Sequence, residues 1–174
     1  YTWFVAISAI PLVILYPLAK RFTKWPQIIL GLTFSWAVPT AWSAANEEWN
    51  SGIFVMYLAT VFWIIGYDTI YGCQDKNEDE IFGIKNSAVS AKNFLTLFVG
   101  SAYSLMFILL IISGYLLKNS IFWYIGVSIC GLHLVRQVIK LKNIEQNNPL
   151  QIFKSNVLLG LILTLSSLGN HIVP

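Results

Sequence analysis

The residues best suited to chemistry lie in one acidic segment, residues 67–88, which reads YDTIYGCQDKNEDEIFGIKNSA. Five of the eight carboxylates in the chain fall between Asp68 and Glu80. At about 100° per residue, Asp75 and Asp79 each lie about 20° from Asp68 on a helical wheel, and Tyr71 lies within about 60°. We therefore expect three carboxylates and a phenol to line one face of a helix, and the segment to bend so that Asp68, Asp75 and Asp79 converge on one cavity at the cytoplasmic end of the bundle.

Carboxylates stacked in this way repel one another, so the face is unfavourable unless cations occupy it. Hard divalent cations prefer carboxylate oxygens, and Mg²⁺ commonly takes one or two carboxylates together with substrate phosphates. The alternative is a solvated loop whose charges only end a helix. Asp68 lies at the end of an otherwise apolar stretch, where an ionisable residue indicates function. The residue pattern alone leaves both interpretations open.

The rest of the chain is strongly apolar, and its apolar stretches must position these side chains. Of 174 residues, 56% are hydrophobic and 11% are charged, and the mean hydropathy is +0.66. Soluble domains are about 25% charged, so this composition excludes an ordinary water-facing surface, and it also excludes intrinsic disorder. A net charge of +3 is too small to indicate nucleic-acid binding. Cys73 and Cys130 have no metal-binding or disulfide spacing.

Long apolar stretches predict membrane helices, because about 20 residues of helix cross the hydrocarbon core. They are continuously apolar rather than alternating, which favours helices over the strands of a barrel. We therefore expect an all-α, multi-pass transmembrane bundle of about six helices. The stretches are Thr2–Ala19, Gln27–Ala45, Ser51–Tyr67, Phe94–Leu117, Ile121–Val135 and Val157–Val173.

The basic residues predict the orientation of this bundle. Ten of the eleven lie in the first, third and fifth connections, and only Lys118 lies on the other side. Cytoplasmic connections carry such an excess of lysine and arginine, so we expect the odd-numbered connections to face the cytoplasm. Arg136, Lys140 and Lys142 are assigned to this signal, and His133 is expected to be a hydrogen-bonded histidine between helices.

Two separated segments resemble motifs of the UbiA-type intramembrane prenyltransferases, most closely the group that acts on 4-hydroxybenzoate. The acidic segment resembles the second aspartate-rich motif of that family. Residues 16–23 (YPLAKRFT), followed by Pro26-Gln27, resemble the first cytoplasmic stretch of the same half. The resemblance covers essentially the whole chain and departs from the family pattern at Gly72, at Glu80 and at Asn86-Ser87.

The resemblance implies a bundle of nine transmembrane helices with a first aspartate-rich motif of NDxxDxxxD type. This sequence contains no such motif. We therefore expect residues 1–174 to form the C-terminal portion of such an enzyme, with the first motif and the N-terminal helices absent. The implied location is a bacterial or mitochondrial inner membrane.

The resemblance also implies an activity, namely Mg²⁺-dependent transfer of a polyprenyl group from its diphosphate to 4-hydroxybenzoate in ubiquinone biosynthesis. Asp75 and Asp79 match the metal-binding carboxylates, and Asp68 and Tyr71 match the leading, catalytic positions of the motif. The substrate-binding candidates are the basic residues near these motifs. Lys85 and Lys76 could contact the diphosphate as point charges, and Arg21, with Lys20 beside it, could contact the acceptor carboxylate.

Other functions remain open from the sequence. A secondary transporter or a cation channel also keeps carboxylates at helix breaks, although no inverted repeat is visible in the chain. A structural membrane subunit would leave the acidic segment unexplained. Within the family, the acceptor could instead be a naphthoate, a homogentisate, a porphyrin or a lipid.

Overall fold

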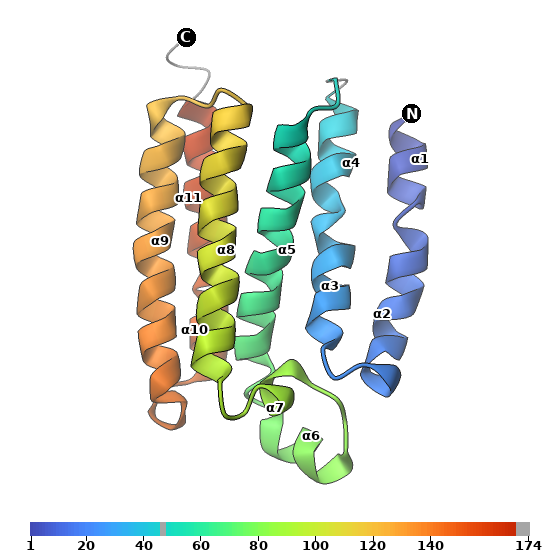
Figure 1. Cartoon of the computed structure of the whole chain (residues 1–174), viewed down its shortest axis with the longest axis vertical. Coiled ribbons are helices and arrows are strands. Elements are labelled where there is room, and N and C mark those ends of the chain that lie inside the picture. Colours follow the sequence, from blue (N-terminus) through green and yellow to red (C-terminus); the bar gives the residue numbers. More distant parts are fainter. Residues whose placement is uncertain (46–47, 170–174) are drawn as a thin grey trace.

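The computed structural model describes residues 1–45 and 48–169, and every regular element within these ranges is a helix (Figure 1). Long helices stand side by side as columns, and short ones connect them. The columns are α1 (Thr2–Ile7) with α2 (Ile10–Phe22), α3 (Pro26–Ser35) with α4 (Ala37–Ala44), α5 (Ser51–Tyr71), α8 (Leu95–Leu116), α9 (Ile121–Lys142), and α10 (Pro149–Lys154) with α11 (Asn156–Leu168). The connecting helices are α6 (Lys76–Phe82), α7 (Ser87–Ser90) and a 3-10 helix (Ile144–Gln146).

Five of these columns are long and apolar enough to cross a membrane, counted over the described ranges. This confirms the predicted all-α, multi-pass bundle. The remaining column, α3 with α4, is interrupted at Trp36 into helices of 10 and 8 residues.

The last two columns differ most from their predicted stretches. α9 continues past the predicted end at Val135 to Lys142, because long basic side chains keep apolar stems along the helix while their charges reach water. The last column begins at Pro149 rather than at Val157, and the end of its predicted stretch, residues 170–173, lies outside the described ranges.

Prolines divide the first two columns. α1 ends at Ile7, four residues before Pro11, and α3 ends at Ser35, four residues before Pro39. A proline removes one backbone donor, and its ring clashes with the carbonyl four residues earlier. The two prolines therefore explain where the columns break, whereas Pro26 begins α3, where no donor is lost.

α5 is the central column and packs closely against α3 and α8. Two glycines allow this approach. The ring of Tyr103 on α8 occupies the space that a Cβ at Gly66 would need, and a Cβ at Gly31 would lie 2.9 Å from the Val61 carbonyl oxygen. The packing holds the C-terminal end of α5, from which the acidic segment continues.

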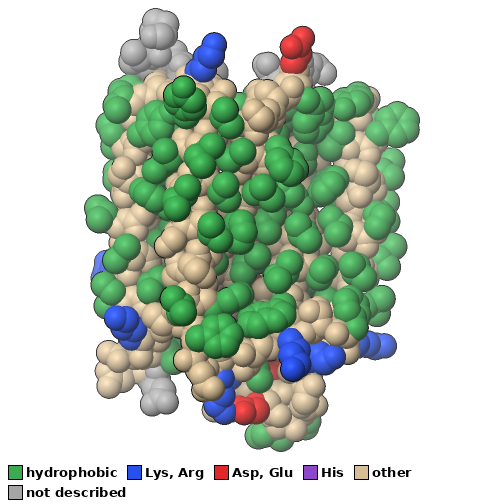
Figure 2. Space-filling view, viewed as in Figure 1, with side chains coloured by type: hydrophobic (Ala, Val, Ile, Leu, Met, Phe, Trp, Pro, Cys, Tyr) green, Lys and Arg blue, Asp and Glu red, His purple; other side chains and the backbone are tan. Residues whose placement is uncertain are grey.

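The face of the bundle shown in Figure 2 is apolar along its length, and charged side chains gather toward its two ends. The end that carries α6 and α7 also carries the first, third and fifth connections, which hold ten of the eleven basic residues. The structure therefore places these basic residues on one side, as the sequence predicted. Their cytoplasmic orientation stays a prediction.

Candidate active site

The acidic segment does not continue as one helix. α5 ends at Tyr71, and α6 begins only at Lys76, after a turn that contains Gly72 and Asp75. A Cβ added at Gly72 would lie 2.6 Å from the side-chain oxygen of Asn86, so a larger residue does not fit there. The predicted single helical face is therefore wrong, because a contact with a distant residue turns the chain between the two helices.

Two of the three predicted carboxylates nevertheless share one small cavity. The cavity has a volume of about 60 Å³ and lies where the ends of α2 and α5 meet the start of α3 and the residue before α7. It has room for about two waters, or for a small ion with a water, but not for an aromatic ring. Its lining residues are Tyr16, Lys20, Pro26, Gln27, Asp68, Tyr71, Gly72, Asp75 and Asn86.

Charged and aromatic groups from different helices face each other in this cavity. Asp68, on the last turn of α5, lines the cavity together with Lys20 of α2 and Gln27 of α3. The ring of Tyr71 packs against Phe153 of α10, with ring centroids 5.0 Å apart. Contacts among α2, α3, α5 and α10 therefore position the predicted catalytic residues Asp68 and Tyr71.

The buried side chain of Asn86 connects the cavity to the turn after α5. Its amide nitrogen donates to the Gly72 carbonyl at 3.0 Å and to the Asp79 carboxylate at 2.8 Å. Its amide oxygen accepts from Ala88 N at 2.9 Å, which caps α7, and from the Gln27 amide at 3.3 Å. One neutral side chain thus joins three segments of the chain.

Asp79, a predicted metal ligand, does not line the cavity. Its side chain is 7% exposed, and it reaches the cavity only through its hydrogen bond with Asn86. Among the side chains that the structure describes, which leave out that of Glu145, no group of three or more histidine, cysteine, aspartate or glutamate residues is placed to hold a metal ion. The metal-binding roles of Asp75 and Asp79 stay predictions.

Of the four basic residues predicted to bind substrate, only Lys20 lines the cavity. Arg21 is exposed and lies outside the lining, and its backbone carbonyl accepts a 3.0 Å hydrogen bond from the Lys85 ammonium. This bond ties the end of α2 to the loop before α7. Lys76, in the first turn of α6, also lies outside the lining.

Five lining residues were not among the predicted site residues, and three of these five have polar side chains. Tyr16, Gln27 and Asn86 all lie in the segments that carry the family resemblance, but their roles depend on contacts between helices. Gln27 and Asn86 are 5% and 3% exposed. The sequence did offer one signal for Gln27, which is a polar residue directly after Pro26 at the start of an apolar helix. A buried amide at such a position needs hydrogen-bond partners.

The turn and α6 also contain two ionisable groups with altered pKa values. Burial raises the pKa of the Cys73 thiol to about 11, partly opposed by Lys76. The Cys73 thiol also donates to the Thr69 carbonyl at 3.4 Å, which fits the interpretation of this cysteine as a packing residue. The Lys92 ammonium, which donates to Glu80 at 2.8 Å, lowers the pKa of that exposed carboxyl.

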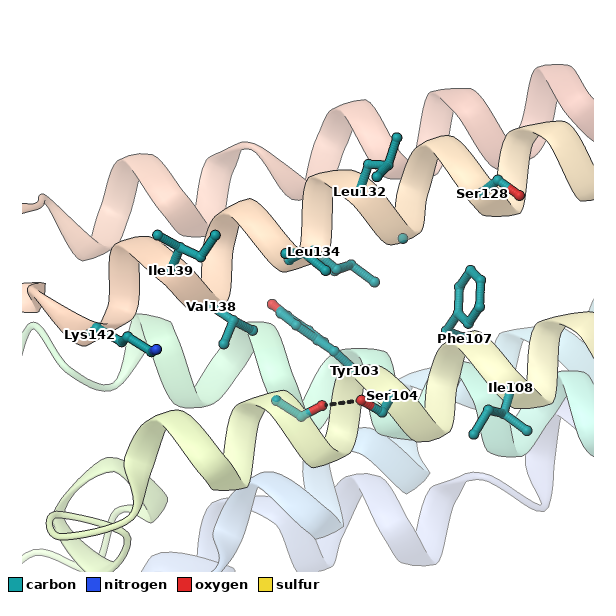
Figure 3. Close-up of a pocket in the computed structure, with 13 residues that line it drawn as sticks. Tyr103, Ser104, Phe107, Ile108, Ser128, Leu132, Leu134, Val138, Ile139 and Lys142 are labelled. Carbon is teal, nitrogen blue, oxygen red and sulfur yellow. Dashed lines mark hydrogen bonds between the residues drawn. The ribbon is translucent and has the colours of Figure 1, made fainter.

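A much larger apolar groove of about 770 Å³ lies between α8 and α9, away from the acidic segment. Figure 3 shows Phe107, Leu132 and Val138 around it, and Lys142 at one end. The Ser104 hydroxyl in its wall is already bonded to the Gly100 carbonyl at 2.8 Å. The groove brings no acid, base or nucleophile together, so it is not a candidate active site.

Comparison with curated proteins gives relatives that align with most of this chain. The chain is 38% identical over 169 residues to the mitochondrial 4-hydroxybenzoate polyprenyltransferase of Dictyostelium discoideum, an alignment that covers 92% of this chain and 35% of that protein. It is 37% identical over 172 residues to the 4-hydroxybenzoate octaprenyltransferase of Francisella tularensis subsp. novicida, covering 99% of this chain and 61% of that protein. The chain therefore spans between about a third and three fifths of these relatives.

No solved structure gives a significant match to the chain. The family model described as the UbiA prenyltransferase family matches residues 1–163. This match includes both motifs and every residue that lines the cavity. The chain belongs to the UbiA prenyltransferase family.

Proposed function

We propose that the protein containing this chain transfers a polyprenyl group from polyprenyl diphosphate to 4-hydroxybenzoate in ubiquinone biosynthesis, within a bacterial or mitochondrial inner membrane. Family membership supports the reaction class, and the names of the relatives support the acceptor. The observation that carries the proposal is the cavity where Asp68, Tyr71 and Asp75 face Tyr16 and Lys20.

The donor groups in this cavity fit Mg²⁺. Asp68 and Asp75 offer carboxylate oxygens to one space, and Mg²⁺ is commonly held by one or two carboxylates and substrate phosphates rather than by an all-protein cage. We propose that these two residues would hold the ion. When bound, Mg²⁺ supplies positive charge that neutralises the departing diphosphate.

The other side chains have separate tasks in this proposal. Lys20 adds a flexible positive charge beside Asp68, suited to a diphosphate or carboxylate oxygen. Gln27 and Asn86 hold the wall of the cavity in place through their mutual hydrogen bond. Asp79 acts through Asn86, as a positioning residue.

The cavity is too small for either substrate, so the substrates must extend beyond these residues. We propose that segments of the protein outside this chain, including the first aspartate-rich motif, complete the site. This proposal agrees with the share of the relatives that the chain spans.

A different acceptor within the same family is the second candidate, because the family match alone is compatible with any aromatic or lipid acceptor. A transporter or channel is disfavoured, since the chain belongs to a prenyltransferase family and the carboxylates lie at helix ends rather than at mid-membrane. The acceptor is distinguished by assaying a panel of aromatic acids with one polyprenyl diphosphate.

The test compares Asp75→Asn with Glu78→Gln in the complete protein. Asp75 lines the cavity, whereas Glu78 is an exposed carboxylate three residues later on α6. Product formation from labelled 4-hydroxybenzoate is measured over a range of Mg²⁺ concentrations. We expect Asp75→Asn to lose about a hundredfold or more in turnover, as for other groups that stabilise developing charge, while Glu78→Gln stays within about twofold. Near-normal turnover of Asp75→Asn would contradict the proposal.

A further inference from the structure

A second polar cavity lies at the same end of the bundle, between α9 and α10, and no part of the proposed prenyl transfer uses it. Its volume is about 130 Å³, which is about four times the volume of one water in the liquid. It shares no residue with the candidate active site. Its lining residues are His133, Arg136, Gln137, Lys140, Gln151, Ile152 and Ser155.

The floor of this cavity is a network of hydrogen bonds. Gln137, 2% exposed, donates to the Ser155 hydroxyl at 3.1 Å and accepts from the Tyr103 hydroxyl at 2.6 Å. Ser155 in turn donates to the Ile152 carbonyl at 2.7 Å, and His133 Nε2 lies 3.0 Å from the same hydroxyl. This confirms the expected hydrogen-bonded role of His133.

Two cationic side chains, Arg136 and Lys140, line the solvent-exposed side of the cavity. Arg136 and Lys140 lie one turn apart on α9, and both are exposed. Among the side chains that the structure describes, which do not include that of Glu145, the one ion pair is Lys92–Glu80, so no described carboxylate pairs with either cation. α9 and α10 contain no aspartate or glutamate, and Glu145 is the only acidic residue in the connection between them.

The general excess of basic residues at this end of the bundle would account for Arg136 and Lys140 as surface charges. It would not account for the cavity with a buried, hydrogen-bonded polar floor that lies beside them. A guanidinium binds a phosphate through two parallel hydrogen bonds, and a neighbouring ammonium adds a point charge. Basic pockets between membrane helices on the cytoplasmic side are suited to anionic lipid headgroups. We propose that Arg136 and Lys140 bind a phosphate group in this cavity, presented by an anionic phospholipid of the adjacent leaflet.

The test measures retention of phosphatidylglycerol by the complete purified protein in phosphatidylcholine nanodiscs, using native mass spectrometry after release. Arg136→Gln and Lys140→Gln are compared with Lys142→Gln, which removes the same charge from the last turn of α9 but lines the other groove. We expect each cavity variant to retain about fivefold less lipid, the factor that corresponds to about 1 kcal/mol for a basic residue at the membrane surface. The Lys142 variant should lose less than about twofold.

Thermal unfolding of all three variants checks that they are folded. Equal losses in the three variants would overturn the proposal, because surface charge alone predicts that result, and so would full retention in the Arg136 and Lys140 variants. Inorganic phosphate and diphosphate are added as competitors. Displacement of the lipid by these ions would assign the phosphate site to a soluble source, whereas retention in their presence supports the lipid.

Discussion

Replacing Asn86 with alanine should destabilise the bundle more than any other change in the acidic segment, because this amide joins the turn after α5, α6 and the start of α7. The alanine removes the donor to the buried Asp79 carboxylate at 2.8 Å and the donor to the Gly72 carbonyl at 3.0 Å. It also removes the oxygen that caps α7 at Ala88 N.

The size of the effect follows from these contacts. A hydrogen bond to a charged group contributes about 1.5–3 kcal/mol, and a buried carbonyl left without a partner costs about 1–3 kcal/mol. Loss of a helix cap costs about 1 kcal/mol. Because the surrounding groups relax in part and the terms do not simply add, we expect a loss of about 3–5 kcal/mol in the free energy of unfolding, at the upper end for single substitutions.

The assay is unfolding of the chain by sodium dodecyl sulfate in mixed micelles, followed by the fluorescence of its seven tryptophans. Asn77→Ala is the matched control, since Asn77 is an exposed asparagine on α6. A cycle that combines Asn86→Ala with Asp79→Ala should give a coupling energy of about 1.5–3 kcal/mol. If Asn86→Ala unfolds within about 1 kcal/mol of the Asn77 control, the amide does not hold the turn and the reasoning fails.

Three further predictions concern charged groups around the site. In the complete protein, Lys20→Gln should lower the rate of prenyl transfer more than Arg21→Gln does, since of the two residues only Lys20 lines the cavity. Equal rates in the two variants, or a larger loss with Arg21→Gln, would instead favour the sequence-based assignment of Arg21 to the acceptor carboxylate. Cys73 should react with a maleimide at pH 8 about a hundredfold more slowly than in the unfolded chain, as a rise in its pKa from 9.0 to about 11 implies; rapid labelling of the folded chain would contradict its burial. The pKa of Glu80 is lowered by Lys92, so the stabilisation by this pair is present above the ordinary pKa of 4.5 and is lost as the pH falls through the lower folded value. The difference in melting temperature between the native chain and Glu80→Gln should shrink accordingly, and a difference that grows in acid would refute the pairing.

Much of the fold could be predicted because membrane helices are marked by continuous apolar composition. The prediction placed the start of α5 at Ser51, and the structure agrees, with the Asn50 side chain capping Ile53 N at 3.3 Å. Its end was placed four residues early, at Tyr67. The hydropathy of the sequence falls at Asp68 because this side chain is charged. The backbone hydrogen bonds of the helix nevertheless continue, since the side chain faces a polar cavity.

The candidate site was predicted less completely because its geometry depends on contacts between distant residues. Helical spacing placed Asp68, Asp75 and Asp79 on one face, but the turn at Gly72 is determined by Asn86, fourteen residues later. Periodicity within a segment contains no information about such a contact. The structure therefore brings Asp68 and Asp75 to one cavity, as expected, whereas Asp79 lies outside its lining.

The choice between Lys20 and Arg21 shows the same limit. The two residues are adjacent on α2, so they point about 100° apart, and the rotation of α2 decides which one faces the cavity. That rotation is set by packing, since Ala19 is fully buried beside them, and the Lys85 bond to the Arg21 carbonyl fixes the helix end.

Two amides, Gln27 and Asn86, supply the wall of the cavity because an amide can donate and accept at once. Gln27 donates to the Asn86 amide oxygen at 3.3 Å and accepts from Ser87 N at 3.0 Å. The Asn86 amide nitrogen in turn donates to the Gly72 carbonyl and to the Asp79 carboxylate. Carboxylates in these positions would repel Asp68, and apolar residues would leave buried donors without partners. A neutral hydrogen-bonded wall therefore leaves the charge in the cavity to Asp68, Asp75 and Lys20, the residues that the proposed binding of a cation and a diphosphate would use.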